Sequence, residues 1–273
     1  MARILVTGSA GYLGAEVVRA AVVAGHEAVG TWYRRPVDGG VQLDVRDRDG
    51  VQVALAEVRP DAVVHAAFVQ DGPDLWPITA EAPGILAAAT AEGGVRLVHI
   101  STDVVFDGEL DPGLRYVETD GTAPVHAYGE AKAAAERLVD GANPAAAIAR
   151  VALIVGGPAP NRQERLVADA LAGAADVTFF TDEVRTPVEV GDLARAMVEL
   201  AGNDWSGPLH LGGEDALSRY ELAALIAGPA AGRLRSARSA DAPGRRPRNC
   251  SLDSSLARSV LSTRLRGVRE VFG

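Results

Sequence analysis

The chain opens with Met1-Ala-Arg-Ile-Leu-Val-Thr-Gly-Ser-Ala-Gly-Tyr-Leu-Gly14, and we expect the fold to be organised around this stretch. The short, branched apolar run Ile4–Val6 is bounded by a glycine turn, which is typical of a buried strand. The apolar-periodic segment 12–24 then predicts a helix. Three glycines at three-residue spacing lie between them: the first permits a tight turn, the second lets the backbone approach a pyrophosphate, and the third lets the helix pack against the strand. Since a helix N-terminus offers free N–H groups and a positive dipole end, the stretch predicts dinucleotide binding; the alternative is an ordinary glycine-rich turn.

Length and composition narrow the class of protein. With 273 residues, the chain can form one large α/β domain, alone or with a small lobe. Apolar runs are too short for a membrane span, no signal peptide is evident, and Cys250 is the only cysteine, so we expect a cytoplasmic protein without a membrane partner. A net charge of −9 argues against a nucleic-acid partner. The arginine-rich segment 233–248 is either a solvated loop or an anion site. No metal-ligand cluster is found.

Strand and helix patterns alternate through the first half of the chain. Such alternation predicts parallel strands joined by right-handed crossovers, which is a Rossmann doubly wound parallel sheet in the α/β class with helices on both faces. The expected strands after the first are 27–32, 41–44, 61–67 and 95–100, and the expected helices between them are 47–58 and 78–92.

The residues at the end of the second strand bear on whether the cofactor is NADPH or NADH. An NAD site usually has Asp or Glu there, whereas this chain has Arg34 and Arg35. A guanidinium suits a 2′-phosphate, so NADPH is preferred and NADH stays open; the arginines could instead face solvent. Asp44, at the end of the third strand, is expected beside the adenine. Ala66 and Ala67 end the fourth strand with small side chains that could let a cofactor approach.

Tyr128-Gly-Glu-Ala-Lys132 is the candidate catalytic motif. Its four-residue spacing places both side chains on one helix face. A nearby ammonium lowers the pKa of a tyrosine, which makes the hydroxyl a usable proton donor. Lys132 is also the only lysine among 27 basic residues. Thr102, after the strand 95–100, can hold a substrate carbonyl. Taken alone, Y-x-x-x-K is more often a surface helix. The expected cofactor contacts are Gly8, Ala10, Gly11, Tyr12, Leu13, Gly14, Arg34, Arg35, Asp44, Val45, Ala66, Ala67, Tyr128 and Lys132.

These motifs together resemble those of the extended short-chain dehydrogenase/reductase superfamily. Within it, Ser101-Thr-Asp-Val-Val-Phe-Asp-Gly108 is similar to the S-T-D-Y-V-F-D-G stretch of dTDP-4-dehydrorhamnose reductases. Segments 59–67, 185–193 and 246–253 are similar to the same family, so the resemblance spans essentially the whole chain. It implies a mainly NAD(P)-binding domain over 1–155. It also implies a mainly substrate-binding lobe over 156–273, with about 188–213 returning to the first domain.

The resemblance also implies roles for the catalytic residues. Tyr128 would be the general acid, Lys132 would bind the nicotinamide ribose, and Thr102 would hold the carbonyl. Hydride would pass from nicotinamide C4 to a ketone carbon while the tyrosine protonates the forming alkoxide. The resemblance suggests a homodimer as well.

Three positions depart from the reductase pattern. Val104 replaces a tyrosine, Leu153 a tryptophan, and Thr79 an asparagine. Lost polar contacts of this kind change substrate specificity by large factors. Arginine suits a diphosphate or carboxylate, although each candidate arginine could equally be structural. The expected substrate contacts are Asp103, Val104, Leu153, Arg162, Arg185 and Arg246.

The sequence therefore predicts an NADPH-dependent ketoreductase, with a dTDP-4-keto-6-deoxysugar as the favoured small-molecule substrate. One alternative is a reductase of a non-sugar natural-product ketone, which the apolar exchanges suggest. The other is a non-catalytic regulatory subunit that binds a dinucleotide or a sugar nucleotide.

Overall fold

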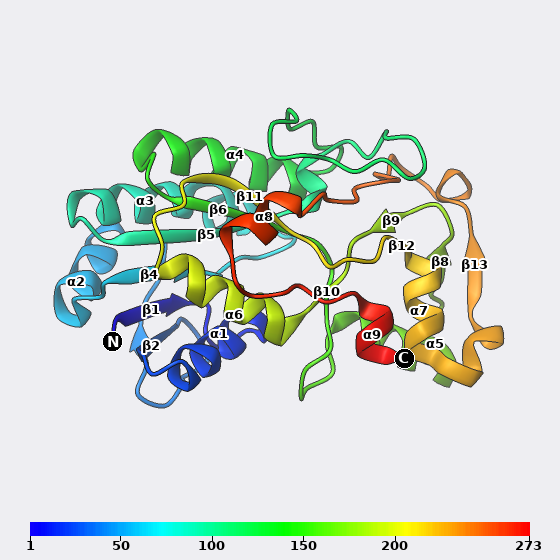
Figure 1. Cartoon of the computed structure of the whole chain (residues 1–273), viewed down its shortest axis with the longest axis horizontal. Helices are drawn as coiled ribbons and strands as arrows, with labels where there is room; N and C mark the ends of the chain where they lie inside the picture. The colour runs from blue at the N-terminus through cyan, green and yellow to red at the C-terminus, as the bar shows by residue number, and fades with distance from the viewer.

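Seven parallel strands form the central sheet of the protein, which a computed structural model describes over residues 1–273 (Figure 1). The strand order is β11-β6-β5-β4-β1-β2-β3. The chain therefore runs outward from β1 in one direction and from β4 in the other, and this reversal is where open α/β sheets bind ligands. The strands are β1 (Arg3–Thr7), β2 (Glu27–Trp32), β3 (Val41–Gln42), β4 (Ala62–His65), β5 (Arg96–Thr102), β6 (Ala147–Val151) and β11 (Gly207–Leu211).

Helices cover both faces of this sheet, as the alternation predicts. Neighbouring residues of β1 point to opposite faces, so Ile4 and Val6 enter one core and Leu5 enters the other. Helices α1 and α6 pack together over the first core, and α2, α3 and α4 cover the second. Their bounds are α1 (Tyr12–Val23), α2 (Arg48–Val58), α3 (Ala82–Glu92), α4 (Ala127–Ala142) and α6 (Val190–Ala201).

Several elements differ from the expected boundaries: β4 covers only Ala62–His65 of the expected 61–67, and β5 continues to Thr102, beyond the expected end at residue 100. The helix expected over 78–92 begins earlier, as a π-helical segment η1 (Leu75–Glu81) that runs into α3. The N–H of Ala82 bonds to the carbonyl of Pro77, five residues back, which is the π-helical pattern. The third strand, expected over 41–44, pairs with β2 only over Val41–Gln42, although the Leu43 N–H still bonds to the Trp32 carbonyl over 2.8 Å.

A smaller lobe packs beside the carboxyl ends of the strands, at the right of Figure 1. Helices α5 and α7 and the parallel pair β8–β13 meet around a core of Val167, Phe179, Ala223 and Leu234. The elements beyond β6, with α6 and β11 already given, are β7 (Ile154–Val155), α5 (Arg162–Ala172), β8 (Thr178–Phe180), β9 (Val184–Arg185), β10 (Val188–Glu189), β12 (Leu217–Ser218), α7 (Arg219–Ala227), η3 (Gly228–Arg233), β13 (Arg235–Ala237), η4 (Ser239–Asp241), α8 (Ser255–Val260) and α9 (Val268–Phe272).

The chain passes back and forth between the sheet and the lobe. After β9 it returns through β10 and α6 to β11, which pairs with β6. It then re-enters the lobe at β12, which pairs antiparallel with β9. Segment 188–211 thus lies against the sheet although it follows lobe residues in sequence.

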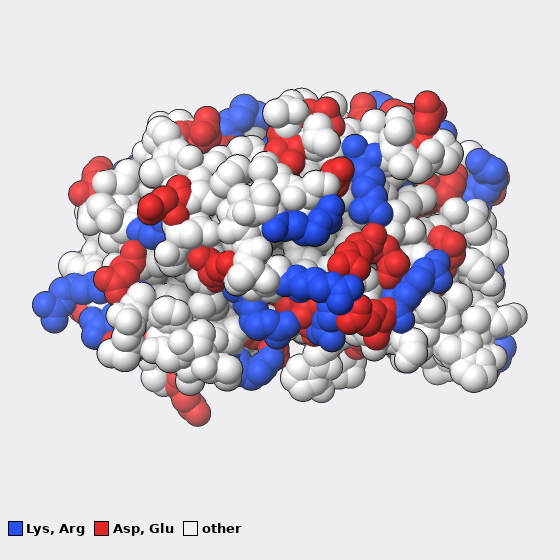
Figure 2. All heavy atoms as spheres, viewed as in Figure 1, with Lys and Arg blue, Asp and Glu red and all other residues white.

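Ion pairs tie the C-terminal segment to the rest of the molecule. Arg266 bonds the fully buried Asp192 of α6, with Nε 2.8 Å from Oδ2. Arg264 pairs with Glu214 and Glu270. Figure 2 shows basic and acidic side chains interleaved across the middle of one face. None of the helices combines the length and apolar character needed to cross a membrane.

Candidate active site

The turn after β1 requires its glycines. Gly8 has a φ of +69°, and a Cβ there would lie 2.8 Å from the amide nitrogen of Ala67. A Cβ on Gly14 would lie 2.3 Å from the carbonyl oxygen of Gly8. No side chain caps the N-terminus of α1, and its first turn holds no acidic residue. Its free N–H groups therefore remain available to an anion, and the residues present fit a dinucleotide pyrophosphate.

The other expected cofactor residues lie around the same end of the sheet. Ala10 belongs to the turn itself, whereas Tyr12 and Leu13 open α1. The Tyr12 hydroxyl donates to the carbonyl of Gly156 in the loop after β7. Ala66 follows β4, where its N–H bonds to the carbonyl of Thr7 over 3.3 Å. Val45 is buried in the core below α2.

Charged residues gather at the end of β2, where the sequence predicts a 2′-phosphate site. Arg34 and Arg35 are exposed, and Arg34 lies over the Tyr33 ring, 5.4 Å from its centroid. The Asp44 carboxylate is bound by the Arg46 guanidinium. The sequence did not point to Arg46 as a residue of this group, although it lies only two residues after Asp44. Hydrogen bonds from Arg46 lower the pKa of Asp44 below its ordinary value.

Helix α4 carries Tyr128 and Lys132 one turn apart. The Nδ1 atom of His126 accepts the N–H of Gly129 and so starts the helix just before the tyrosine. The Lys132 ammonium is buried and donates to the Ile100 carbonyl over 2.8 Å, which fixes α4 to β5. The tyrosine is therefore held close to the carboxyl end of β5.

Phe68 contacts both catalytic candidates and was not expected. Its ring centroid lies 5.9 Å from that of Tyr128 and 5.5 Å from the Lys132 Nζ atom. The ring is 52% exposed, which is unusual for a phenylalanine. The signal available in the sequence was its position directly after Ala66 and Ala67, the small residues predicted to end the fourth strand.

Thr102 ends β5 and bonds its own neighbours. Its hydroxyl donates to Asp103 Oδ1 over 3.1 Å and accepts the Val104 N–H over 3.4 Å. Asp103 is buried, its Oδ2 lacks a hydrogen bond, and the Arg185 Nε atom lies 3.4 Å from that oxygen. Burial raises the pKa of Asp103, and the guanidinium opposes that rise.

The prediction that Lys132 lowers the pKa of the tyrosine is wrong for this structure. Burial raises the pKa of Tyr128 above its ordinary value, and the nearby Asp103 carboxylate adds to the rise. Burial also lowers the pKa of Lys132 to about 8, with Glu136 opposing it. Four-residue spacing predicts a shared helix face, but here the ammonium is directed to a backbone carbonyl. Tyr128 is thus protonated at neutral pH, which is the form that a general acid needs.

The substrate-side candidates lie in different surroundings. Arg185 donates to the carbonyls of Val184, Pro247 and Arg248, and Arg246 pairs with Glu183 while lying over the Phe180 ring. These two guanidinium groups already have partners inside the protein, so an anion-binding role for them stays a prediction. Arg162 is exposed and donates to Gln70 Oε1 over 2.7 Å.

The three positions that depart from the reductase pattern each have a defined environment in the structure. Thr79 is buried, and its hydroxyl donates to the Val69 carbonyl over 2.7 Å and accepts the Val69 N–H over 3.0 Å. Leu153 packs against the apolar cluster around Leu217, and Val104 is half-buried. The Thr79 hydroxyl therefore joins η1 to the loop after β4, and the other two positions present apolar side chains.

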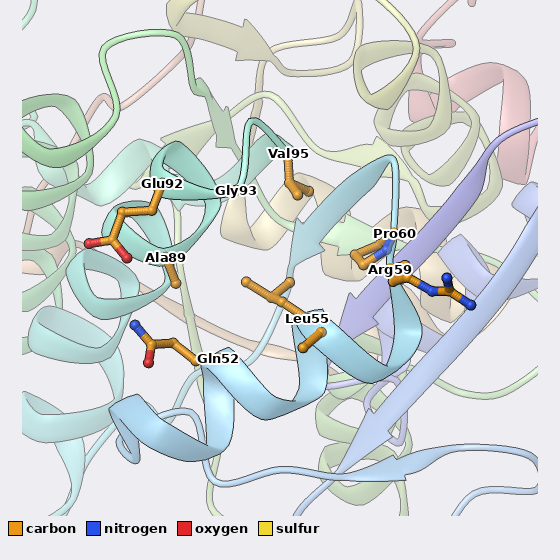
Figure 3. A pocket seen from close by; sticks show the side chains of 9 residues that line it. Gln52, Leu55, Arg59, Pro60, Ala89, Glu92, Gly93 and Val95 are labelled. Atoms are coloured by element: carbon orange, nitrogen blue, oxygen red, sulfur yellow. The ribbon is translucent and has the colours of Figure 1, made fainter.

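An open hollow of about 480 Å³ lies elsewhere, between the C-terminal ends of α2 and α3 (Figure 3). Its lining includes Leu55, Arg59 and Glu92, near the amino ends of β4 and β5. The catalytic candidates lie at the carboxyl ends of these strands, so the hollow is separate from the candidate site.

The chain was compared with known proteins. The family model described as RmlD substrate binding domain matches residues 2–272. The probable low-salt glycan biosynthesis reductase Agl14 of Haloferax volcanii is 32% identical, over 92% of this chain and 89% of that protein. A dTDP-4-dehydrorhamnose reductase of Mycobacterium tuberculosis is 30% identical, over 90% and 83%. The beta subunit of methionine adenosyltransferase 2 of Pongo abelii is also 30% identical, over 93% and 80%.

Two solved structures show the same fold. One is a hypothetical dTDP-4-dehydrorhamnose reductase from Sulfolobus tokodaii, with a TM-score of 0.83 and 30% identity over 97% of this chain and 96% of that one. The other is the dTDP-4-dehydrorhamnose reductase of Bacillus anthracis in complex with NADP. It has a TM-score of 0.85 and 22% identity over 100% and 97%.

Proposed function

This chain belongs to the RmlD substrate binding domain family, and from that premise we propose that it is an NADPH-dependent ketoreductase. The favoured substrate is a dTDP-4-keto-6-deoxysugar. The observation that carries the proposal is the pair Tyr128 and Lys132, one turn apart on α4, with the lysine bonded to β5 just before Thr102. Curated relatives named as reductases, which match nearly the whole length of the chain, support it.

The protein's own residues would bind and orient the cofactor. The glycine turn and the free N–H groups of α1 suit the pyrophosphate, and Arg34 and Arg35 suit a 2′-phosphate. The Bacillus anthracis relative was crystallised with NADP, which favours NADPH, while NADH stays an alternative. Lys132 keeps two N–H groups beyond its bond to Ile100, and these could hold the nicotinamide ribose. NADPH supplies the hydride when it is bound.

The proton would come from Tyr128. Because its pKa is raised, the hydroxyl stays protonated at neutral pH and can give its proton to the alkoxide that forms as the ketone is reduced. The Thr102 hydroxyl now donates to Asp103, and by rotating it could donate to the substrate carbonyl instead.

The test is NADPH oxidation with a dTDP-4-keto-6-deoxysugar by the wild type and Tyr128→Phe. We expect the substitution to lower kcat by about 100- to 10,000-fold, the usual contribution of a general acid, while NADPH affinity measured by fluorescence stays within about twofold. Tyr220→Phe, on α7 in the lobe, is the matched control and should keep its activity. Failure to bind either NADPH or NADH would refute the proposal.

A second candidate is a non-catalytic subunit. It is favoured by the 30% identity to the beta subunit of methionine adenosyltransferase 2 and by the engagement of the Thr79 hydroxyl with the backbone of Val69. In that case Tyr128→Phe would leave the protein's biological role unchanged.

The apolar side chains of Val104 and Leu153 favour a third candidate, reduction of a non-sugar ketone. Tight NADPH binding without turnover of any sugar nucleotide would favour this reading, and a screen of other ketones would follow.

A further inference from the structure

Arg219 is a charged residue of the site that no motif in the sequence singles out. It is the first residue of α7, and its N–H bonds to the carbonyl of Glu183 over 2.9 Å, directly beyond the pairing of Ser218 with Val184. This places the half-buried side chain beside β9, on the side of Arg185 and Asp103. Its guanidinium makes neither a hydrogen bond nor an ion pair within the protein.

The neighbouring charges leave this cation without a counter-ion. Two carboxylates lie nearby, but Asp103 faces Arg185 and Glu183 pairs with Arg246. Burial, together with the positive charge of Arg185 and Arg162, lowers the pKa of Arg219 to about 10. A partly desolvated guanidinium without a partner is costly in a folded protein, and an anionic ligand would relieve that cost.

Arg162 is the second uncompensated cation of this group. It opens α5, and its only side-chain partner is the neutral amide oxygen of Gln70, which follows β4 on the sheet side. Once the two internal ion pairs are set aside, the guanidinium groups of Arg219 and Arg162 remain as two positive charges without counter-ions. A carboxylate would balance one of them, whereas a doubly esterified diphosphate carries two negative charges.

We propose that Arg219 and Arg162 together bind the diphosphate of a nucleotide-linked substrate, an inference that rests on the proposed function. Each planar guanidinium can contact two phosphate oxygens at once. Arg162 would exchange Gln70 for a phosphate oxygen. Asp103 lies within electrostatic range of both Arg219 and Tyr128, so the diphosphate binds on the same side of the sheet as the proton donor.

Calorimetric titration of the full chain with thymidine diphosphate and with thymidine tests this. Arg219→Met should weaken thymidine diphosphate binding by about 10- to 100-fold, the usual effect of removing a charged hydrogen-bonding partner, and leave thymidine binding unchanged. Arg162→Gln, at an exposed position where folding is not at risk, should weaken it in the same direction. Arg165→Met, one turn further on α5, is the control and should bind as the wild type does.

The outcomes separate this inference from the proposed function. Equal affinity of wild type, Arg219→Met and Arg162→Gln for thymidine diphosphate would overturn the inference even if sugar nucleotides are reduced. Binding that depends on Arg219 would support it even if no ketone is turned over. Circular dichroism melting of each variant identifies any loss of affinity that comes from unfolding, and Arg162→Gln then decides the result.

Discussion

The buried ion pair between Arg150 of β6 and Glu136 of α4 gives the most direct test of the packing beneath the site. Arg150 Nη2 lies 2.8 Å from Glu136 Oε2, its Nε contacts both carboxylate oxygens at 3.1 and 3.2 Å, and Ser101 donates to the same carboxylate. Both side chains are less than a tenth exposed. Arg150→Met leaves Glu136 with one hydroxyl partner, and breaking a buried pair in this way costs about 3–5 kcal/mol.

Urea unfolding followed by circular dichroism measures this cost, because an unchanged slope with a lower midpoint reports stability alone. For a chain of this length, about 2 °C per kcal/mol gives a fall in Tm of roughly 6–10 °C. The double variant Arg150→Met/Glu136→Leu should recover most of the loss, since neither charge is then left unpaired. Arg235→Met breaks a pair that is largely exposed and should cost less than about 1 kcal/mol. A loss below about 1 kcal/mol for Arg150→Met, or a double variant as unstable as the single one, would refute the reasoning.

Three further predictions concern the residues proposed to bind the cofactor. Burial lowers the pKa of Lys132 to about 8, so the lysine is charged below that pH and neutral above it. We therefore expect kcat/KM for reduction to fall above about pH 8, and a flat profile to pH 10 would contradict this. A Cβ on Gly14 would meet a backbone carbonyl oxygen at 2.3 Å, so Gly14→Ala should weaken NADPH binding by at least about 10-fold in a fluorescence titration. Gly202→Ala is the control, because a Cβ there makes only ordinary van der Waals contacts, and it should leave NADPH binding unchanged. Replacing both Arg34 and Arg35 by alanine should lower the preference for NADPH over NADH by about 10-fold or more in paired titrations, and an unchanged ratio would place the 2′-phosphate elsewhere.

The sequence was sufficient to predict the fold and the family. Short local patterns carry this information: a branched run, a glycine spacing and the alternation of strands with helices each act over a few residues. The parallel sheet and the dTDP-4-dehydrorhamnose reductase resemblance are both confirmed. The assignment of Tyr128 and Lys132 to one helix face agrees with α4.

What the sequence could not predict depends on contacts between distant segments. The raised pKa of Tyr128 follows from its burial and from Asp103, and neither can be read from the spacing to Lys132. Arg219 is conspicuous only because Arg185 and Arg246 take the nearby carboxylates. Phe68 matters only because the end of β4 lies beside α4. Each of these depends on tertiary pairing, to which local sequence patterns are insensitive.

The repeated passage of the chain between sheet and lobe restricts how the two can move. A lobe joined by one linker could swing as a rigid body, but this one is connected through β7, β10 and β12, each paired to a neighbouring strand. The ion pairs of Arg264 and Arg266 add a further attachment at the C-terminal segment. Adjustment to a ligand must therefore occur as a small shear distributed over several strand ends, and not as a wide hinge opening. For the same reason neither part is a contiguous segment that could be excised, and we expect the sheet and the lobe to unfold together in a single cooperative transition.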